Sequence, residues 1–291
     1  MHRRTPRGCG PVERRNAMTP ATVSIVIPLY NQLKYTKLCL ESLRSTLNVL
    51  PEIILVDNAS TDGTADYLRT LSNIKVISNT ENLGFAGGCN TGIRAASGDW
   101  VVVLNNDVIV APGWLEGMLN AADRWNLQIV TPAIREGEFD YDIGAYAREL
   151  TGRMQRVIRR GMANGICFMV HRSVFDAIGL LDEKFLIGQY EDKDFFLRAA
   201  RAGFALGTVG SAFLHHFGSA TQKVLKRNSG PRPYALENKA YFARKWKLSW
   251  WKRLAGRLRE RFSTRVSSLI ERTRYGHTLM EKMIDGRLQY E

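Results

Sequence analysis

Short apolar runs alternate with amphipathic segments over the first half of this 291-residue chain. Buried strands are predicted where the runs are rich in β-branched residues, at 23–27, 53–56, 74–77 and 100–104. Apolar residues at helical spacing predict helices over 34–47, from Asp62 onward, over 85–96 and over 114–122. Strands that alternate with helices predict an α/β fold with a mostly parallel sheet, right-handed crossovers and flanking helices.

The second half of the chain has a less regular pattern. Residues 132–163 are polar with Arg-rich stretches and predict a mobile loop or insert. A strand is expected over 164–171, followed by a helix over 190–202 with acids in its first turn. A further strand over 204–209 leads to two adjacent histidines, 215 and 216.

The chain ends in a basic amphipathic segment. Over 246–270 apolar residues recur every three to four positions with arginines between them, which predicts a helix. Its apolar stripe either packs on the rest of the protein or lies in an anionic membrane surface, and the sequence leaves both open. The longest apolar runs are far shorter than the roughly 20 residues that span a bilayer.

Composition and charge divide the chain into three parts. Hydrophobic residues make up 45% and charged residues 24%, which excludes a disordered or fibrous protein. The net charge of +13 is concentrated at the ends, with five Arg against one acid in 1–20 and eighteen Lys or Arg against six acids in 222–291. We therefore expect a disordered basic segment over 1–20, a mildly acidic catalytic domain over 21–234 and a basic helical tail over 235–291.

Cysteine usage and the N-terminus indicate a cytoplasmic protein. Cys9, Cys39, Cys89 and Cys167 are far apart and form no CxxC pair, so neither a zinc site nor a disulfide framework is indicated. Residues 1–20 have no apolar core of a secretory signal, and Met18 is an alternative start. If the tail binds lipid, the protein is expected at the inner face of the cytoplasmic membrane.

Polar side chains follow each predicted strand of the first half: Tyr30, Asn31, Asp57, Asn58, Asn82, Asn105, Asn106 and Asp107. In parallel sheets ligands bind at the carboxyl ends of the strands, so these side chains are expected to form one rim. Any single Asp or Asn is better explained as a turn residue, but four strand ends together favour a site.

Three groups of side chains suggest chemistry. Asp107 ends a buried strand beside amides, an arrangement that suits a divalent cation completed by phosphate oxygens, and a turn residue is the alternative. Glu191 and Asp192 open a helix, where they act either as caps or as a general base. His215 and His216 are surface or packing residues, or supply an imidazole ligand that would make Mn²⁺ as suitable as Mg²⁺.

Eight blocks of sequence occur in a recognisable order over about residues 22–221: VSIVIPLYN (23–31), ILVDNASTDGT (54–64), ENLGFAGGCNTGI (81–93), GDWVVVLNNDV (98–108), ANGICFMVHRSVF (163–175), LLDEKF (180–185), YEDKDFFLRAARAGF (190–204) and HHFGSAT (215–221). Together they resemble the inverting family 2 glycosyltransferases of the GT-A fold. The NND motif and the EDxD helix start resemble the rhamnosyltransferase and galactofuranosyltransferase branches most.

The resemblance implies roles for individual residues. Pro28, Tyr30 and Asp57 would contact the nucleoside of a nucleotide-sugar donor, with Asn31 and Asn106 beside it. The donor pocket would also contain Asn82, Gly84 and Asn90. Asp107 matches the last acid of the family's DxD motif and would bind Mn²⁺ or Mg²⁺, but Asn105 replaces the first acid and brings no charge. His216 matches a late metal ligand, and His215 is the alternative if the loop shifts by one.

The resemblance also implies the reaction. Asp192 would be the general base and Glu191 its neighbour in the ED pair, for inverting transfer from a donor such as dTDP-L-rhamnose or a UDP-hexose. The basic, Trp-bearing tail suggests a lipid-linked or cell-envelope glycan as acceptor, and 132–163 are expected to help select it.

Other functions fit the sequence less well. A nucleic-acid-binding protein would carry its positive charge along one groove with stacking aromatics, whereas the excess here is terminal. A nucleotide-sugar-binding protein without catalysis would not need Asp107, Asp192 and His216. A nucleotidyltransferase would want a basic glycine-rich loop near the first strand, where only Lys34 is present.

Overall fold

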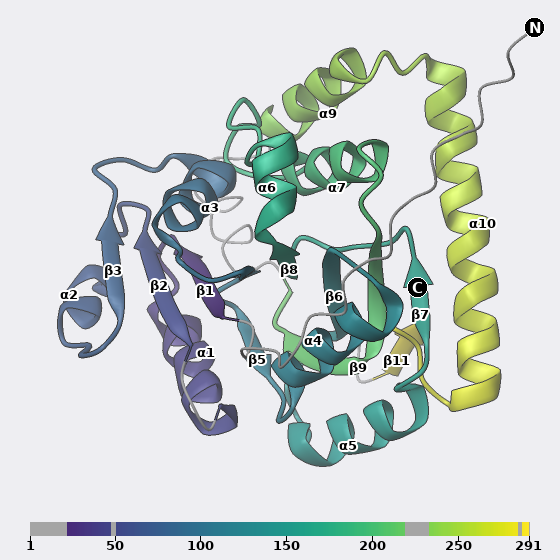
Figure 1. The fold of residues 1–291 in the computed structure, drawn as a ribbon, viewed down its shortest axis with the longest axis horizontal. Helices are drawn as coiled ribbons and strands as arrows, with labels where there is room; N and C mark the ends of the chain where they lie inside the picture. Colours follow the sequence, from purple (N-terminus) through teal and green to yellow (C-terminus); the bar gives the residue numbers. More distant parts are fainter. Residues whose placement is uncertain (1–21, 48–50, 219–232, 285–286, 291) are drawn as a thin grey trace, which may run out of the picture.

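The computed structural model describes residues 22–47, 51–218, 233–284 and 287–290. The segment 1–20, which we predicted to be disordered, and residues 219–221 of the last sequence block lie outside this description. The described chain forms a single mixed sheet with helices on both faces (Figure 1). No helix in the described part is long and apolar enough to cross a membrane.

The first half of the sheet is parallel, as the sequence predicted. Its strands lie in the order β4-β1-β2-β3: β1 (Val23–Leu29), β2 (Glu52–Asp57), β3 (Lys75–Ser78) and β4 (Trp100–Leu104). The helices of this half are α1 (Leu33–Thr46), α2 (Thr64–Arg69), α3 (Gly84–Ala95) and α4 (Trp114–Trp125). Each confirmed element differs from its predicted bounds by only a few residues.

Alternation along the strands builds one apolar core on each side of the sheet. Ile25 and Ile27 of β1 pack in the core that contains Leu40 of α1, whereas Val26 packs in the core that contains Ile93 of α3. Helix α3 approaches β1 so closely that a Cβ atom on Gly92 would overlap the side chain of Val26. This close packing explains why the helix is rich in glycine.

The second half of the sheet is mixed. Its strands are β5 (Val108–Val110), β6 (Ile129–Glu136), β7 (Ile158–Arg160), β8 (Cys167–His171) and β9 (Leu206–His216). Strand β8 is antiparallel to β4 and β6, and β9 is parallel to β6. Three helices accompany them: α5 (Ile143–Met154), α6 (Arg172–Ile178) and α7 (Glu191–Arg201).

The prediction of a loop or insert over 132–163 is wrong. The end of β6, all of α5 and β7 occupy this range, and α5 packs Leu150 and Met154 against Phe213 of β9. The polarity of the segment was misleading because Arg135 is buried in β6, where its guanidinium lies over the ring of Tyr141. A buried cation that packs on aromatic rings gives the same sequence pattern as a solvent-exposed one.

The C-terminal tail is helical only in part. It contains α9 (Pro233–Lys245) and α10 (Trp250–Tyr275), which were expected, and two strands that were not, β10 (Met280–Ile284) and β11 (Arg287–Tyr290). Strand β10 pairs in parallel with β6 and places β11 at the edge of the sheet (Figure 1). The prediction of a wholly helical tail fails because the free edge of β6, which the sequence could not reveal, provides the pairing.

A buried ion pair fixes α10 to the rest of the protein. Arg159 of β7 donates from Nε and Nη2 to the two carboxylate oxygens of Glu271, at 2.6 and 2.7 Å, and also to Ser268 Oγ at 3.1 Å. Glu271 Oε2 further accepts a hydrogen bond from the backbone N–H of Leu279, at 3.0 Å. These contacts connect helix α10, strand β7 and the approach to β10.

We expect Arg159→Met to lower the free energy of unfolding by about 3–5 kcal/mol, because Glu271 would remain buried without its cation. Arg69→Met, which breaks the exposed pair with Asp66, is the matched control and should cost at most about 1 kcal/mol. Urea denaturation followed by circular dichroism measures both. Equal, small losses in the two variants would show that the buried pair does not hold α10.

Candidate functional site

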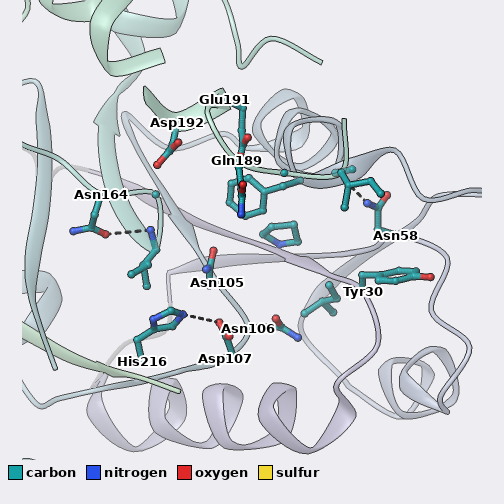
Figure 2. Close-up of a pocket in the computed structure, with 18 of the residues that line it drawn as sticks. Tyr30, Asn58, Asn105, Asn106, Asp107, Asn164, Gln189, Glu191, Asp192 and His216 are labelled. Atoms are coloured by element: carbon teal, nitrogen blue, oxygen red, sulfur yellow. Dashed lines mark hydrogen bonds and ion pairs between the residues drawn. The ribbon is translucent and has the colours of Figure 1, made fainter. Parts of the chain in front are cut away.

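A cleft of about 570 Å³ opens where the strands of the first half of the sheet end (Figure 2). The predicted site residues that line it are Pro28, Tyr30, Asn82, Gly84, Asn105, Asn106, Asp107, Glu191, Asp192 and His216. They come from five separate stretches of sequence. The three stretches at or after the ends of β1, β3 and β4 meet because the carboxyl ends of parallel strands share one edge, whereas the other two lie at the start of α7 and the end of β9. Residues 163–166 and 187–189 form further parts of the wall.

Three predicted residues do not line the cleft. Asn90 is buried in α3 instead, where it donates to Leu181 O and Glu183 Oε1 and accepts from Leu181 N, at 2.7–3.0 Å. Its prediction as a donor-pocket residue is therefore corrected: all these bonds join α3 to the 181–183 loop. Asn31 follows β1 and Asp57 ends β2; the backbone N–H of Asn31 donates to Ser60 Oγ, and Asp57 Oδ1 accepts from Ser60 N.

Asn58 organises the wall near Tyr30, although the sequence analysis noted it only as part of the rim. Its side-chain amide donates to Asn82 Oδ1 at 2.8 Å and to Gly84 O at 3.0 Å. Its Oδ1 accepts from Asn79 Nδ2 and Leu83 N. One buried amide thus fixes the backbone between β3 and α3.

Asp107 and His216 meet at the floor of the cleft (Figure 2). The antiparallel pairing of β5 with β9 places His216 opposite Val108, next to Asp107. His216 Nε2 lies 3.4 Å from Asp107 Oδ1, and its Nδ1 lies 3.2 Å from Glu136 Oε2 at the end of β6. Glu136 was missed because its segment was interpreted as a loop, although the apolar run 129–134 before it is a strand signal.

The charge state of His216 indicates what this floor can bind. Burial alone would lower the pKa of His216, but the carboxylates of Asp107 and Glu136 outweigh it and raise the pKa to about 9. The site therefore favours a positive charge between two carboxylates. In the described residues no group of three or more Asp, Glu, His or Cys can hold a metal ion, so further oxygen donors would have to come from a ligand.

The side-chain amide of Asn105 adds an uncharged oxygen that could bind a metal ion. Its Oδ1 is buried and has no hydrogen-bond partner among the described residues. An unpaired buried carbonyl oxygen is costly unless a ligand or ion satisfies it. The donor set of carboxylate, imidazole and amide oxygen fits Mn²⁺ or Mg²⁺ whose other positions are filled by phosphate oxygens.

His215 lies on the opposite face of β9 from His216, because successive strand residues alternate. It is fully buried among aromatic rings, and its Nδ1 is 3.1 Å from the hydroxyl of Tyr141. Burial and the neighbouring positive charges lower its pKa to about 4. Of the two histidines left open by the sequence, only His216 lines the cleft.

Glu191 and Asp192 begin α7 and both line the cleft. Asp192 is partly exposed and accepts a hydrogen bond from Lys193 N at 2.7 Å, whereas Glu191 is buried and its Oε2 has no partner in the described residues. Burial raises the pKa of both carboxyls, and the two charges oppose each other. A Cβ atom on Gly165 would lie 2.6 Å from Asp192 Oδ2, so only glycine leaves room for this carboxylate.

The loop before α7 has a strained backbone that Asn238 of α9 holds in place. Ile187, Gln189 and Tyr190 have positive φ angles of 57°, 82° and 77°, which are unfavourable for non-glycine residues. The buried side chain of Asn238 donates to the carbonyls of residues 186, 188 and 189 and accepts from the N–H of residue 186, at 2.9–3.2 Å. A helix 50 residues away in sequence therefore shapes the loop that carries the two acids, a long-range contact that no sequence motif indicated.

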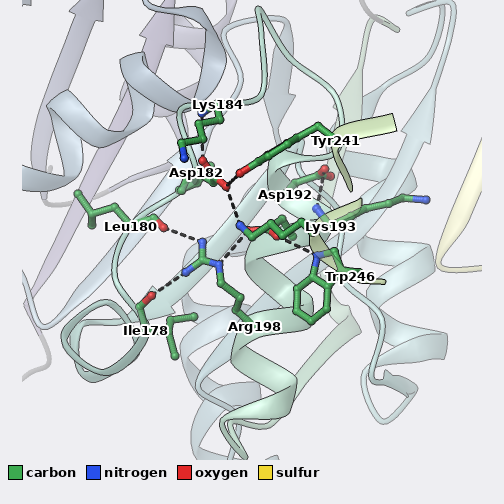
Figure 3. Close-up of polar contacts among 12 residues, drawn as sticks. Ile178, Leu180, Asp182, Lys184, Asp192, Lys193, Arg198, Tyr241 and Trp246 are labelled. Carbon is green, nitrogen blue, oxygen red and sulfur yellow. Dashed lines mark hydrogen bonds and ion pairs between the residues drawn. The ribbon is translucent and has the colours of Figure 1, made fainter. Parts of the chain in front are cut away.

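In a second contact between α7 and α9, Arg198 and Trp246 point toward one cluster of polar side chains (Figure 3). The contact centres on Asp194, which is fully buried. Its carboxylate accepts from Arg198 Nε at 2.9 Å, Lys245 Nζ at 2.8 Å and Trp246 Nε1 at 2.9 Å. Lys245 also reaches Asp182 at 2.6 Å. Asp194 is therefore a structural residue, unlike Glu191 and Asp192, the other two acids in the first turn of α7, which line the cleft.

Comparisons with known proteins agree with this fold. Residues 24–179 match the profile of "Glycosyl transferase family 2", which is more than half of the chain. An N-acetylglucosaminyl-diphospho-decaprenol L-rhamnosyltransferase from Mycobacterium tuberculosis is 27% identical over 81% of this chain and 89% of its own length.

Two solved structures share the fold at low sequence identity. They are TarS from Staphylococcus aureus (TM-score 0.53, 17% identity, 67% of this chain) and a Pyrobaculum calidifontis mannosyltransferase in complex with GDP-Man and Mn²⁺ (TM-score 0.53, 18% identity, 70% of this chain). The matched region spans 60% of each of those chains. With the profile match over most of the catalytic fold, these findings show that the chain is a glycosyltransferase and belongs to glycosyl transferase family 2.

Proposed function

We propose that this enzyme transfers a sugar, with inversion, from a nucleoside diphosphate donor to a hydroxyl of a lipid-linked glycan. The observation that carries the proposal is that one cleft has a partly exposed carboxylate, Asp192, across from the Asp107–His216 pair (Figure 2). A base and a site for a diphosphate on facing walls are what a single displacement at a sugar carbon requires.

The donor that fits best is dTDP-L-rhamnose, with UDP-hexoses as the second choice. The rhamnosyltransferase similarity covers 81% of the chain, and the NND motif at 105–107 supports the same branch. Pro28, Tyr30 and the turn containing Asp57 would receive the nucleoside. Asn82 and Gly84, held by Asn58, would lie beside the diphosphate and sugar.

The acceptor would be a sugar carried on a polyprenyl diphosphate. The name of the mycobacterial relative specifies such a substrate, and the present chain is similar to it over most of its length. An acceptor with a lipid tail requires the enzyme to work at a membrane surface, which for this chain would be the cytoplasmic face. The described cysteines, Cys39, Cys89 and Cys167, are all free and buried, in keeping with a reducing compartment.

The mechanism follows from the positions of the side chains. The acceptor hydroxyl attacks the anomeric carbon, Asp192 takes the hydroxyl proton as the new bond forms, and the nucleoside diphosphate leaves from the opposite face. Burial raises the pKa of Asp192, which makes it a stronger base than an exposed carboxylate. Gly165 and the strained loop before α7 keep the carboxylate at this wall.

Asp107 and His216 would hold Mn²⁺ or Mg²⁺ together with the donor phosphates, with Asn105 as a neutral neighbour. When bound, such an ion neutralises the charge that develops on the leaving diphosphate. Glu136 would orient His216 by accepting from its Nδ1, which leaves Nε2 facing Asp107.

The cleft argues against a nucleic-acid-binding protein. Asp107, Glu136, Glu191 and Asp192 line it, with Lys193 as the only Lys or Arg of the lining among the described residues, whereas a nucleic-acid groove is rich in Lys and Arg. A nucleotide-sugar-binding protein without catalysis would gain nothing from a carboxylate with a raised pKa at Asp192. Product analysis by mass spectrometry after incubation with donor and acceptor separates binding from transfer.

The first functional prediction concerns the base. Asp192→Asn keeps the shape of the side chain but removes the proton acceptor, so turnover should fall about 10²- to 10⁴-fold. The dissociation constant of the donor should change little, because the lost interaction belongs to the transition state. Steady-state kinetics and calorimetric donor binding measure the two quantities.

Glu191→Gln is the comparison variant for this experiment. If it is inactive while Asp192→Asn retains activity within a few-fold of the wild type, the base is Glu191. If both variants remain active, neither acid is the base.

The second prediction concerns the metal. EDTA should abolish transfer, and Mn²⁺ or Mg²⁺ should restore it. A nucleoside diphosphate with Mn²⁺ at about 100 times its dissociation constant should stabilise the wild type by about 2.7 kcal/mol, measured as a thermal shift. Asp107→Asn should lose the Mn²⁺-dependent part of this shift, while Asp99→Asn, at the other end of β4, should keep it. Full activity in EDTA would remove the metal from the mechanism.

The third prediction concerns Glu191. Its pKa in the folded protein is raised to about 8 by burial and by Asp192, from an ordinary value near 4.5. A raised pKa contributes stability below pH 4.5 that is lost as the pH rises through 8, at about 1.4 kcal/mol for each pKa unit. Glu191→Gln should therefore match the wild type in melting temperature at pH 5 and exceed it at pH 8.5. Glu116→Gln on the surface of α4 is the control, and parallel pH profiles for Glu191→Gln and wild type would contradict the shift.

A further inference from the structure

Helix α10 turns a polar face towards the protein and an apolar face away from it. Ser268 and Glu271 are its buried residues, through their bonds to Arg159. The outward apolar face, defined here as Trp251, Leu258, Phe262, Val266 and Leu269, is exposed; Phe262 and Leu269 are 73% and 66% exposed. The polarity is the reverse of that expected for a helix that packs its apolar stripe on a globular core.

The spacing makes this a continuous stripe. Leu258, Phe262, Val266 and Leu269 follow one another at intervals of four, four and three residues, so they lie along one side of the helix. Figure 1 shows α10 running along the outside of the molecule, past β7. Contiguous exposed apolar surface of this kind marks an interaction site.

The charges beside the stripe point to an anionic partner. Arg261 and Arg265 are exposed and lie four residues apart, one turn along the same side of the helix and next to Phe262. Like charges at this spacing destabilise a helix unless an anionic partner neutralises them. The same row of arginines opposes contact with a second copy of the helix. An apolar stripe bordered by arginines, with exposed tryptophans at one end, is typical of a helix in a lipid interface.

An ion pair places this helix beside the cleft. Glu260 of α10 lies 3.8 Å from Nζ of Lys193, which follows Asp192 and lines the cleft. The inward face of α10 therefore lies beside Lys193 at the cleft, with the apolar stripe on the opposite side of the helix.

We propose that the outward apolar face of α10 docks on an anionic phospholipid surface and holds the mouth of the cleft at that surface. Binding of α10 to lipid does not depend on the proposed sugar transfer. The delivery of a lipid-linked acceptor to the cleft does rest on that proposed function. The anchor through Arg159 and Glu271 keeps the helix on the protein while the stripe is buried in lipid.

The test uses the full chain, because deletion of 235–291 would also remove β10 from the sheet. Sedimentation with phosphatidylcholine vesicles, with and without phosphatidylglycerol, measures the partition. The wild type should bind the anionic vesicles more tightly. Leu258→Ser/Phe262→Ser/Leu269→Ser should weaken this binding at least about tenfold, because these side chains supply the apolar contact. Leu236→Ser, at an equally exposed leucine of α9, is the control and should bind like the wild type.

A charge variant tests the anionic preference. Each substitution in Arg261→Gln/Arg265→Gln should weaken binding to anionic vesicles about fivefold and leave binding to neutral vesicles unchanged. The stripe variant should turn over a water-soluble acceptor analogue at the wild-type rate and a vesicle-embedded acceptor more slowly. Failure of the wild type to transfer sugar to either acceptor would count against the proposed function and would leave the vesicle result intact.

Three results would overturn the lipid proposal. The first is a wild type that does not bind anionic vesicles, and the second is a stripe variant that binds them as tightly as the wild type. The third is a wild-type dimer, seen by analytical ultracentrifugation, that the stripe variant converts to a monomer while neither protein binds vesicles; the partner would then be a second copy.

Discussion

The buried carboxylate of Asp194 joins α7 to α9, and the geometry of the cleft wall that carries Glu191 and Asp192 depends on this junction. A fully desolvated anion is tolerated only because Arg198, Lys245 and Trp246 all donate to it. With α9 fixed in this way, Asn238 reaches the loop before α7 and holds its left-handed residues. The two acids that follow the loop are therefore presented to the cleft by contacts made outside it.

The sequence was informative where local pattern and tertiary environment agree. Strands β1, β2 and β4 are buried on both faces and are read directly from apolar runs that end at polar residues. The sequence did not reveal the end of β6 or α5. Arg135 is buried against aromatic rings, so a charged residue there did not indicate an exposed segment. To identify His216 rather than His215 as the cleft residue, one has to know how β9 pairs with β5. To see that Asn90 is a structural residue, one has to know that the 181–183 loop packs against α3. These contacts join residues that are distant along the chain, which no single-sequence pattern encodes.

The electrostatic environment differs between the floor of the cleft and the wall that carries α7. Asp107 and Glu136 lie on either side of His216, and the raised pKa of that histidine shows that a positive charge is favoured between them. On the wall that carries α7, the pKa values of Glu191 and Asp192 are raised because burial disfavours their charged forms. In the proposed mechanism a cation would lie at the floor beside Asp107, while the carboxylate of Asp192 on the α7 wall would accept a proton. This separation matches a displacement in which negative charge leaves on one side as a proton is removed on the other.

The way α10 is attached explains how its apolar face remains available. A helix usually joins a globular protein by burying its apolar stripe, and the stripe is then lost to any other partner. Here the attachment is made by the Arg159–Glu271 ion pair and Ser268, with β10 continuing the chain into the sheet. A buried ion pair adds little net stability compared with apolar packing, so stability alone does not account for this arrangement. It does, however, fix the orientation of the helix, because a bidentate pair allows one geometry. The outward direction of the stripe is thereby set by the same contacts that set the position of Glu260 near Lys193 and the cleft.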